Sequence, residues 1–226
     1  MRSTQRWQRT IRRLWQVVDS LFIVERNFSA SSHIHVAPIG RRFTLRQLKT
    51  IGFAIAFYEP LVLNCLANER RGNRYCIPNS RASNALAMSI RSQRPGQAVA
   101  AFRSVRSRNQ LRDLMQGGER TVLWNFLNTV GHDASGTIEF RGGRHLRGRR
   151  RSCWWIAFVL AFVSMALEDV RNFCPSPLGD VITAFLQPSQ CKRAVCKFSL
   201  PKTRTYCIID DAVVGSYAAL EQVQLG

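Results

Sequence analysis

The chain has 226 residues, of which 46% are hydrophobic, a composition that fits one domain with a real core and excludes a wholly disordered chain. Its formal net charge is +19, and most of the basic residues are arginine. Arginine makes bidentate contacts with phosphate and carboxylate, so we expect a nucleotide, a nucleic acid or an acidic substrate, and charge alone does not choose among them.

The cysteine pattern argues against a zinc module. The number of cysteines is seven, which is odd, and no two of them have the CxxC spacing of a zinc ribbon. We therefore expect reduced thiols in a cytoplasmic protein. The arginine-rich N-terminus has no uninterrupted apolar run and does not resemble a signal peptide.

The first predicted elements are a helix and a strand. Apolar residues recur at intervals of three and four over residues 4–25, which predicts an amphipathic helix. The stretch Ser32–Pro38 alternates polar and apolar residues, which predicts a β-strand with His33 and His35 on one face. Imidazole is a metal ligand and a donor to phosphate or carboxylate, although two histidines on one strand are also compatible with a purely structural role.

Helical patterns follow. Thr44 is a predicted N-cap for a helix that ends near Leu66, and Pro60 is expected to kink that helix or to start a second segment. A polar loop rich in arginine and asparagine is predicted over residues 68–84. Two more helices are predicted over residues 85–94 and 97–116, the second ended by the glycines that follow it.

A second alternating stretch raises the expectation of a functional site. Residues 121–130 predict a strand, and a short turn joins it to Gly136–Gly143 as a hairpin. In this latter stretch Thr137, Glu139 and Arg141 share a face. A carboxylate beside a guanidinium, followed by two glycines, is typical of a site for a metal and an anion, whereas an exposed edge-strand pair would contribute little. We predict that this face and the histidine face belong to one sheet.

The last predicted element is an apolar helix over residues 153–170. Its apolar run, residues 153–167, is shorter than the 18–20 residues that a membrane span needs, so we predict a buried core helix. From residue 171 the pattern weakens and prolines interrupt it. The sequence predicts one domain over residues 1–170 and a loosely structured C-terminal tail over residues 171–226.

The order of these motifs resembles the amidoligases common in fungi, a family of glutamine-synthetase-like carboxylate–amine ligases. The likeness extends over roughly residues 15–170 and is specific as a set, since no single motif would identify the family. The stretches that carry it are, in chain order, His33–Pro38, Tyr58–Pro60, Arg70–Cys76, Gly136–Arg141 and Trp155–Ile156.

The resemblance implies a fold and a chemistry. The fold is mixed α/β, an antiparallel curved sheet with helices packed on one face. The activity is ATP-dependent amide formation through an acyl phosphate, with Mg²⁺ or Mn²⁺ as cofactor and a carboxylate and an amine as substrates. His33 and Glu139 would bind the metal, His35 would face nucleotide or substrate, and Arg141 would hold the transferring group. Arg70 and Arg71 would bind phosphate or the substrate carboxylate.

The chain departs from the family pattern before His33. The family opens with a strand that carries glutamates and completes the metal site, whereas Asp19 and Glu25 are the only acids upstream here. We therefore expect a truncated ligase that lacks its N-terminal strands. The alternatives are an inactive nucleotide- or protein-binding remnant and a basic nucleic-acid-binding protein. The last is less favoured because the basic residues are not grouped with aromatic residues. We expect no specific nucleic acid and no membrane as partner.

Overall fold

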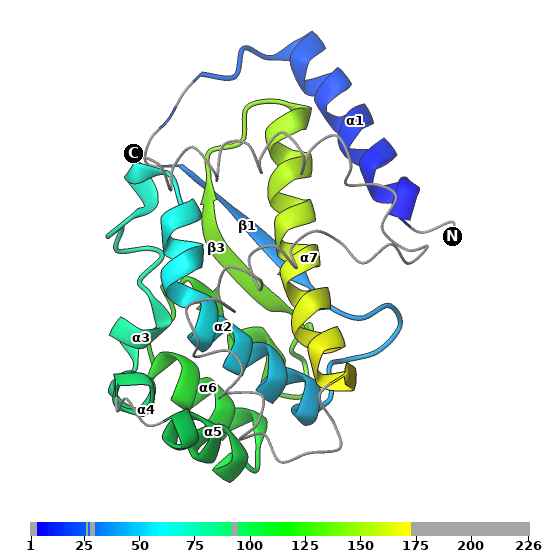
Figure 1. Cartoon of the computed structure of the whole chain (residues 1–226). Helices are drawn as coiled ribbons and strands as arrows, with labels where there is room; N and C mark the ends of the chain where they lie inside the picture. The colour runs from blue at the N-terminus through cyan, green and yellow to red at the C-terminus, as the bar shows by residue number, and fades with distance from the viewer. Residues whose placement is uncertain (1–3, 26, 28–29, 92–94, 173–226) are drawn as a thin grey trace.

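The computed structural model describes residues 4–25, 27, 30–91 and 95–172, and within these ranges it is a mixed α/β structure with seven α-helices and one three-stranded antiparallel sheet (Figure 1). The predicted tail from residue 173 onward lies outside the described residues. The helices are α1 Thr4–Leu21, α2 Leu45–Cys65, α3 Asn79–Ala82, α4 Asn84–Arg91, α5 Pro95–Ser104, α6 Arg108–Gln116 and α7 Arg149–Asn172. The strands are β1 Ser31–Val36, β2 Trp124–Asn125 and β3 Ile138–Arg144.

The middle strand of the sheet is β3, with β1 on one side and β2 on the other. Glu139 lies opposite both His35 and Asn125, and Phe140 lies opposite Trp124 in the adjacent row. The register between β1 and β3 shifts between Ser32 and Ile34, so His33 sits at an irregularity of the ladder. The sequence prediction that the two alternating stretches share one antiparallel sheet is confirmed.

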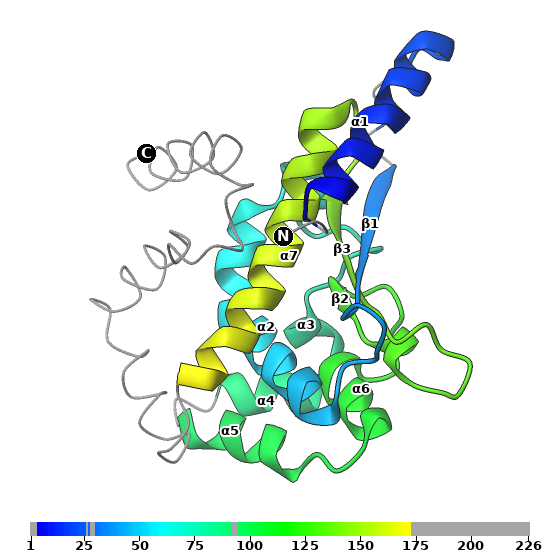
Figure 2. The same ribbon diagram turned by 90° about the vertical axis from the view of Figure 1, so that its right-hand side faces the viewer.

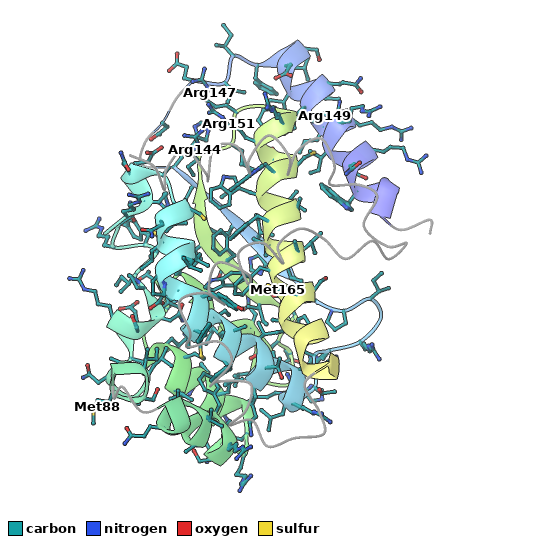
Figure 3. All side chains as sticks on the ribbon, in the orientation of Figure 1. Met88, Arg144, Arg147, Arg149, Arg151 and Met165 are labelled. Atoms are coloured by element: carbon teal, nitrogen blue, oxygen red, sulfur yellow. The ribbon has the colours of Figure 1, made fainter. Side chains whose placement is uncertain are left out.

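Helices α2 and α7 cover the apolar face of the sheet (Figure 2). The ring of Phe140 lies 5.6 Å from that of Trp155 and 5.7 Å from that of Phe158, and the rings of Trp124 and Phe162 are 5.0 Å apart. Tight aromatic packing of this kind adds to the free energy gained by burying apolar area. Figure 3 shows the side chains that fill the space between these layers. The prediction that residues 153–167 form a buried core helix is confirmed for one side of the helix, where Trp155, Val159 and Phe162 are at most 5% exposed, whereas Leu160 is 37% exposed.

The length argument against a membrane span is weaker than the sequence suggested, because α7 extends beyond its apolar run. Residues Arg149–Leu167 are long and apolar enough to cross a membrane by length and composition, and 39% of this stretch is buried inside the protein. The contacts of α7 with the sheet are those of a core helix, and the absence of a membrane span stays a prediction.

Several predicted helices are confirmed with different bounds. Thr44 is the N-cap of α2 in a capping box with Gln47, and α2 continues as one helix through Pro60, which is exposed. The predicted helix over residues 97–116 is two helices, because Ser107 starts α6 by accepting a hydrogen bond from the Gln110 N–H. The predicted loop over residues 68–84 contains α3.

The predicted strand over residues 121–130 is confirmed at Trp124 and Asn125, which form β2, and is wrong for the rest of that range, where Val122 makes an isolated parallel bridge with Ile77. A 3₁₀ turn occupies Leu127–Thr129. Asn125 Oδ1 accepts from the Leu127 N–H at 2.9 Å, and Thr129 Oγ1 donates to the Phe126 carbonyl at 2.7 Å. These side chains compete with the ladder for backbone partners and turn the chain, although most of the run remains buried.

The two glycines that follow Arg141 permit close packing, and their place in the fold is not that of an anion cradle. A Cβ at Gly142 would lie 2.6 Å from Phe140 Cζ and 2.7 Å from Leu123 Cδ1, and one at Gly143 would lie 2.0 Å from Ser32 Oγ. Glycine at these two positions allows β1, β2 and α2 to approach β3.

Candidate functional site

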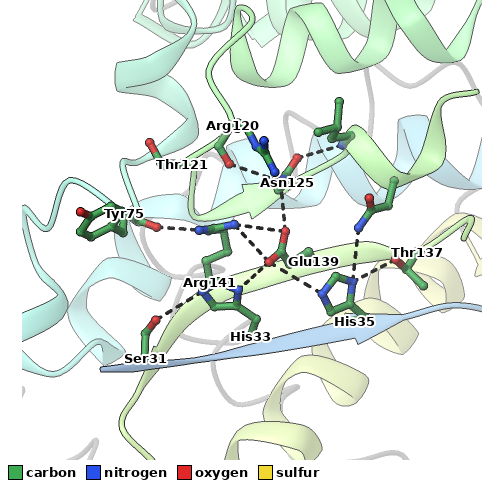
Figure 4. A network of polar contacts seen from close by, with 12 residues as sticks. Ser31, His33, His35, Tyr75, Arg120, Thr121, Asn125, Thr137, Glu139 and Arg141 are labelled. Carbon is green, nitrogen blue, oxygen red and sulfur yellow. Dashed lines mark hydrogen bonds and ion pairs between the residues drawn. The ribbon is translucent and has the colours of Figure 1, made fainter. Parts of the chain in front are cut away.

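The polar face of the sheet brings together the four residues that the sequence assigned to one site. His33 and His35 come from β1, and Glu139 and Arg141 come from β3 (Figure 4). His33 Nδ1 lies 2.8 Å from Glu139 Oε1, and Arg141 Nη1 lies 3.2 Å from the same oxygen. The prediction that these side chains share one face is confirmed.

Glu139 is the centre of the cluster and its most buried member, with 7% of its side chain exposed. Its Oε1 accepts from His33 and Arg141, and its Oε2 accepts from Asn125 Nδ2 at 3.0 Å. Both carboxylate oxygens therefore have protein partners. The histidine side chains are 35% and 43% exposed, so a ligand would meet the imidazoles before it reached the carboxylate.

The environment of His33 favours the neutral imidazole. Burial lowers the pKa of His33 below 6.5, and the Arg141 cation lowers it further, although Glu139 acts in the opposite direction. A neutral His33 that donates from Nδ1 to Glu139 has its lone pair on Nε2, which faces Ser31 Oγ at 3.3 Å. Hydroxyl, imidazole and carboxylate thus form a chain in which His33 Nε2 can accept a proton.

His35 makes weaker contacts. Its Nδ1 lies 3.1 Å from Thr137 Oγ1 and 3.5 Å from Asn128 Nδ2, and its Nε2 lies 3.7 Å from Glu139 Oε1. These contacts orient the ring at the mouth of the site without committing Nε2 to a short hydrogen bond. The role that the resemblance implies for His35, contact with nucleotide or substrate, stays a prediction.

The loop after α2 holds Arg141 in place. Arg141 Nε donates to the Tyr75 carbonyl at 3.2 Å. Arg70 is 1% exposed, and its Nη2 donates to the Arg141 carbonyl at 2.8 Å. The Nε and Nη1 atoms of Arg70 are buried without a hydrogen-bond partner. A buried guanidinium with unsatisfied donors is costly to the folded protein, and these two atoms have no exposed surface at which a ligand could meet them.

Arg71 does not join this cluster. Its Nε donates to the Leu66 carbonyl at 3.1 Å, and its Nη2 donates to the Asn64 carbonyl at 2.6 Å. These are carbonyls at the C-terminal end of α2, where a cation stabilises the helix. Of the two adjacent arginines, the structure brings only Arg70 to the site.

The residues present do not by themselves fit a resident divalent cation. No group of three or more His, Cys, Asp or Glu side chains in the described part of the chain could hold a metal. His33 Nδ1 and Glu139 Oε1 face each other at hydrogen-bond distance, and the Arg141 cation occupies the same carboxylate. Mg²⁺ prefers octahedral oxygen coordination, which these two side chains cannot provide.

Sequence reasoning missed three contributors to the site. Asn125 reaches Glu139 from β2, Ser31 faces His33, and Tyr75 contributes its backbone carbonyl to Arg141. Asn125 had a detectable signal, because asparagine is depleted in strands and stands here between two aromatic residues. A backbone carbonyl leaves no trace in a sequence.

No protein-family model, curated protein or solved structure matches this chain.

Proposed function

We propose that this chain binds the phosphate groups of ATP at the polar face of its sheet, as a member of the glutamine-synthetase-like carboxylate–amine ligases. The observation that carries the proposal is the cluster of His33, Glu139 and Arg141 on one face of the sheet, where the Arg141 guanidinium lies beside two partly exposed imidazoles. An antiparallel sheet with the site on one face and helices on the other supports the glutamine-synthetase-like fold that the motifs imply.

Arginine provides the binding step. A phosphoryl or carboxylate oxygen at the polar face would accept hydrogen bonds from the Arg141 guanidinium, and charge-assisted hydrogen bonds of this kind are about twice as strong as neutral ones. Arg141 Nη1 already spans both oxygens of Glu139, at 3.2 and 3.4 Å, which fixes the guanidinium beside the two histidines. An anion that binds beside the two histidines would therefore contact the Arg141 guanidinium, which is already held in position.

The chain of Ser31, His33 and Glu139 suits the amine step of a ligase. ATP transfers its terminal phosphoryl group to the substrate carboxylate and leaves as ADP. An amine then attacks the acyl carbon, phosphate departs, and a proton leaves the amine nitrogen. Neutral His33 can take that proton at Nε2, because Glu139 holds its other nitrogen as a donor.

The geometry supports binding more strongly than turnover. Phosphoryl transfer in this class uses a divalent cation, and the described residues do not hold one. We therefore propose that nucleotide binding survives in the described residues and that amide formation needs carboxylate ligands beyond Glu139. A reduced, cytoplasmic setting, in which Cys65, Cys76 and Cys153 stay free thiols, accompanies this proposal.

Calorimetric titration of the full chain with ATP, with and without Mg²⁺, tests the binding step. We expect millimolar or tighter binding that Arg141→Gln weakens at least about tenfold, since a charge-assisted contact contributes about 1.5–3 kcal/mol. Arg112→Gln is the matched control, because Arg112 pairs with Asp113 on α6 and lies outside the site. An equal loss of ATP affinity in both variants would overturn the proposal. So would the absence of binding at 10 mM ATP, a concentration that corresponds to a binding free energy on the order of 2.7 kcal/mol.

An assay of ADP release that is stimulated by amines tests the turnover step. We expect little or no stimulation by hydroxylamine or ammonium with the described site alone. Robust amine-dependent release that His33→Gln abolishes would show that the described residues suffice for catalysis, contrary to the geometric argument.

A further inference from the structure

Helix α1 has more apolar surface than its contact with the rest of the protein covers. Trp15 is buried against α7, and its Nε1 donates to Ser152 Oγ at 2.7 Å. Leu14, Val17 and Leu21 recur at intervals of three and four along the helix, yet they are 52%, 54% and 68% exposed. One part of the apolar arc of α1 packs on α7, and the neighbouring part faces outward.

The exposed strip continues past the end of the helix. Phe22 and Ile23 follow directly and are 65% and 93% exposed. Five large apolar side chains in ten residues therefore project from one edge of the molecule. Scattered exposed apolar residues are ordinary on a protein surface, but a contiguous strip of this kind marks an interaction site.

The same end of the molecule is crowded with arginine (Figure 3). The exposed arginines there lie on α1, on the loop before α7 and in the first turn of α7, and they are Arg9, Arg12, Arg13, Arg147, Arg149, Arg150 and Arg151. The first turn of α7 carries no acidic residue. Cations at a helix N-terminus oppose the helix dipole, so this arrangement favours an anionic partner.

The chemistry of the strip distinguishes among partners. A second copy of this chain is disfavoured because each copy carries a net charge of +19. Nucleic acid would engage the arginines, but it offers little to Val17, Leu21 and Ile23, since aliphatic side chains do not stack on bases as aromatic ones do. An anionic lipid bilayer matches both parts of this surface, because its headgroups can pair with the arginines and its acyl boundary can bury the apolar strip.

We propose that α1, its exposed extension Phe22–Ile23 and the adjacent arginines form a docking surface for an anionic lipid bilayer. Binding is peripheral: α1 lies in the plane of the headgroups, and no segment needs to cross the membrane. This inference departs from the sequence-based expectation that membranes are not partners, which stays a prediction. That expectation considered only spanning segments, and the exposure of α1 is visible only in the structure.

Co-sedimentation of the full chain with vesicles tests the proposal. We expect binding to vesicles of phosphatidylcholine with 30% phosphatidylserine and at least tenfold weaker binding to phosphatidylcholine alone. Arg147→Gln with Arg150→Gln should weaken binding by about fivefold for each arginine removed. Val17→Gln with Leu21→Gln should weaken it by at least tenfold, because both side chains leave water on insertion.

Control variants with matched chemistry come from the opposite end of the molecule, where α3, α4 and α5 lie (Figure 1). Met88→Gln removes a side chain that is 72% exposed, and Arg81→Gln with Arg103→Gln removes two exposed arginines. None of these should change vesicle binding. The far-ultraviolet circular dichroism of every variant is compared with wild type, since all the altered side chains are at least half exposed or lie outside the core.

Four results would overturn the proposal. One is the absence of binding to the anionic vesicles, and another is unchanged binding by the Val17/Leu21 variant. The third is tighter binding to single-stranded RNA than to vesicles, with no dependence on Val17 or Leu21, which would assign the arginines to nucleic acid. A concentration-dependent dimer that the Val17/Leu21 variant abolishes would assign the strip to self-association instead.

Discussion

His33 shows how neighbouring charges decide the protonation of a single side chain. Burial and Arg141 lower its pKa, and Glu139 raises it. We therefore expect Glu139→Gln to lower the pKa of His33 further and Arg141→Gln to raise it, as followed by the imidazole carbon-bound proton signals in nuclear magnetic resonance. Arg112→Gln should leave it unchanged. A raised pKa of His33 in Glu139→Gln, together with a lowered pKa in Arg141→Gln, would mean that the cluster does not exist in solution.

The same residue links stability to pH. The folded protein binds a proton at His33 less readily than the unfolded chain, whose histidine has the ordinary pKa of 6.5. As pH falls below that value, the unfolded state takes up a proton that the folded state resists, so the free energy of unfolding should decrease. We expect urea denaturation of His33→Gln to show a weaker loss of stability between pH 7 and pH 5 than wild type, and an identical loss would refute this contribution.

Glu59 should show the opposite dependence. Burial on α2 raises its pKa, although hydrogen bonds from Ser80 act against that shift. Ionising the buried carboxyl at neutral pH is therefore unfavourable in the folded state, and stability falls as pH rises through the folded pKa. We expect Glu59→Gln, whose Oε1 can still accept from the Ser80 N–H, to be more stable than wild type at pH 7. The difference should narrow as pH approaches 4.5.

At the scale of elements, Asn79 ties α3 to α6 and β2. It is fully buried, its Nδ2 donates to the carbonyls of Met115 and Trp124, and its Oδ1 accepts from the Trp124 N–H. We expect Asn79→Ala to reduce the free energy of unfolding by about 3 kcal/mol or more, because three buried backbone groups lose their partners. Equilibrium urea denaturation measures this.

A control separates this effect from loss of an ordinary surface hydrogen bond. Ser104→Ala removes an exposed contact on α5 and should cost less than about 1 kcal/mol. Because β2 carries Asn125 to Glu139, the Asn79 variant should also disturb the His33 signals, whereas the Ser104 variant should not. Equal stability losses in the two variants would contradict the bridging role of Asn79.

The sequence predicted elements well where periodicity was strong and backbone partners were local. The face shared by His33, His35, Glu139 and Arg141 follows from a period of two, and the start of α2 follows from Thr44 and Gln47. The end of β2 was missed because side chains of Asn125 and Thr129 capture backbone groups, a competition that an apolar run conceals. The separation of Arg70 from Arg71 depends on where α2 ends in space, which no local pattern encodes.

At the scale of the whole molecule, Gly142 marks the point where the layers meet. A Cβ there would lie within 2.8 Å of atoms from Phe140, Leu123 and Leu66, which belong to β3, the segment before β2 and the end of α2. We expect Gly142→Ala to cost about 1–3 kcal/mol through overpacking, measured as a lower midpoint in urea. Gly118→Ala is not overpacked, since nothing lies within 4 Å of its added Cβ.

Gly142→Ala and Gly118→Ala would lower the free energy of unfolding for different reasons. Gly118 has a φ of +87°, so its substitution strains the backbone locally and should leave the site unaffected. Substitution at Gly142 should displace β3 and weaken the contact between His33 and Glu139. If ATP titration shows the same affinity for Gly142→Ala and wild type, the packing of the layers does not control the geometry of the site.

Because β3 is the middle strand of the sheet, β1 is synthesised long before the strand with which it pairs. Within the part of the chain that the structure describes, β1 and β2 each pair with β3 alone. The contact of His35 with Thr137 therefore forms only after the ribosome has added a further 102 residues. During this interval β1 is outside the ribosome, and its unpaired backbone donors and acceptors can pair with strands of other chains. We therefore expect that chaperone binding to the emerging chain, or slow translation before β3, changes the yield of folded protein. Either one should change the yield more than it changes the stability of the folded protein.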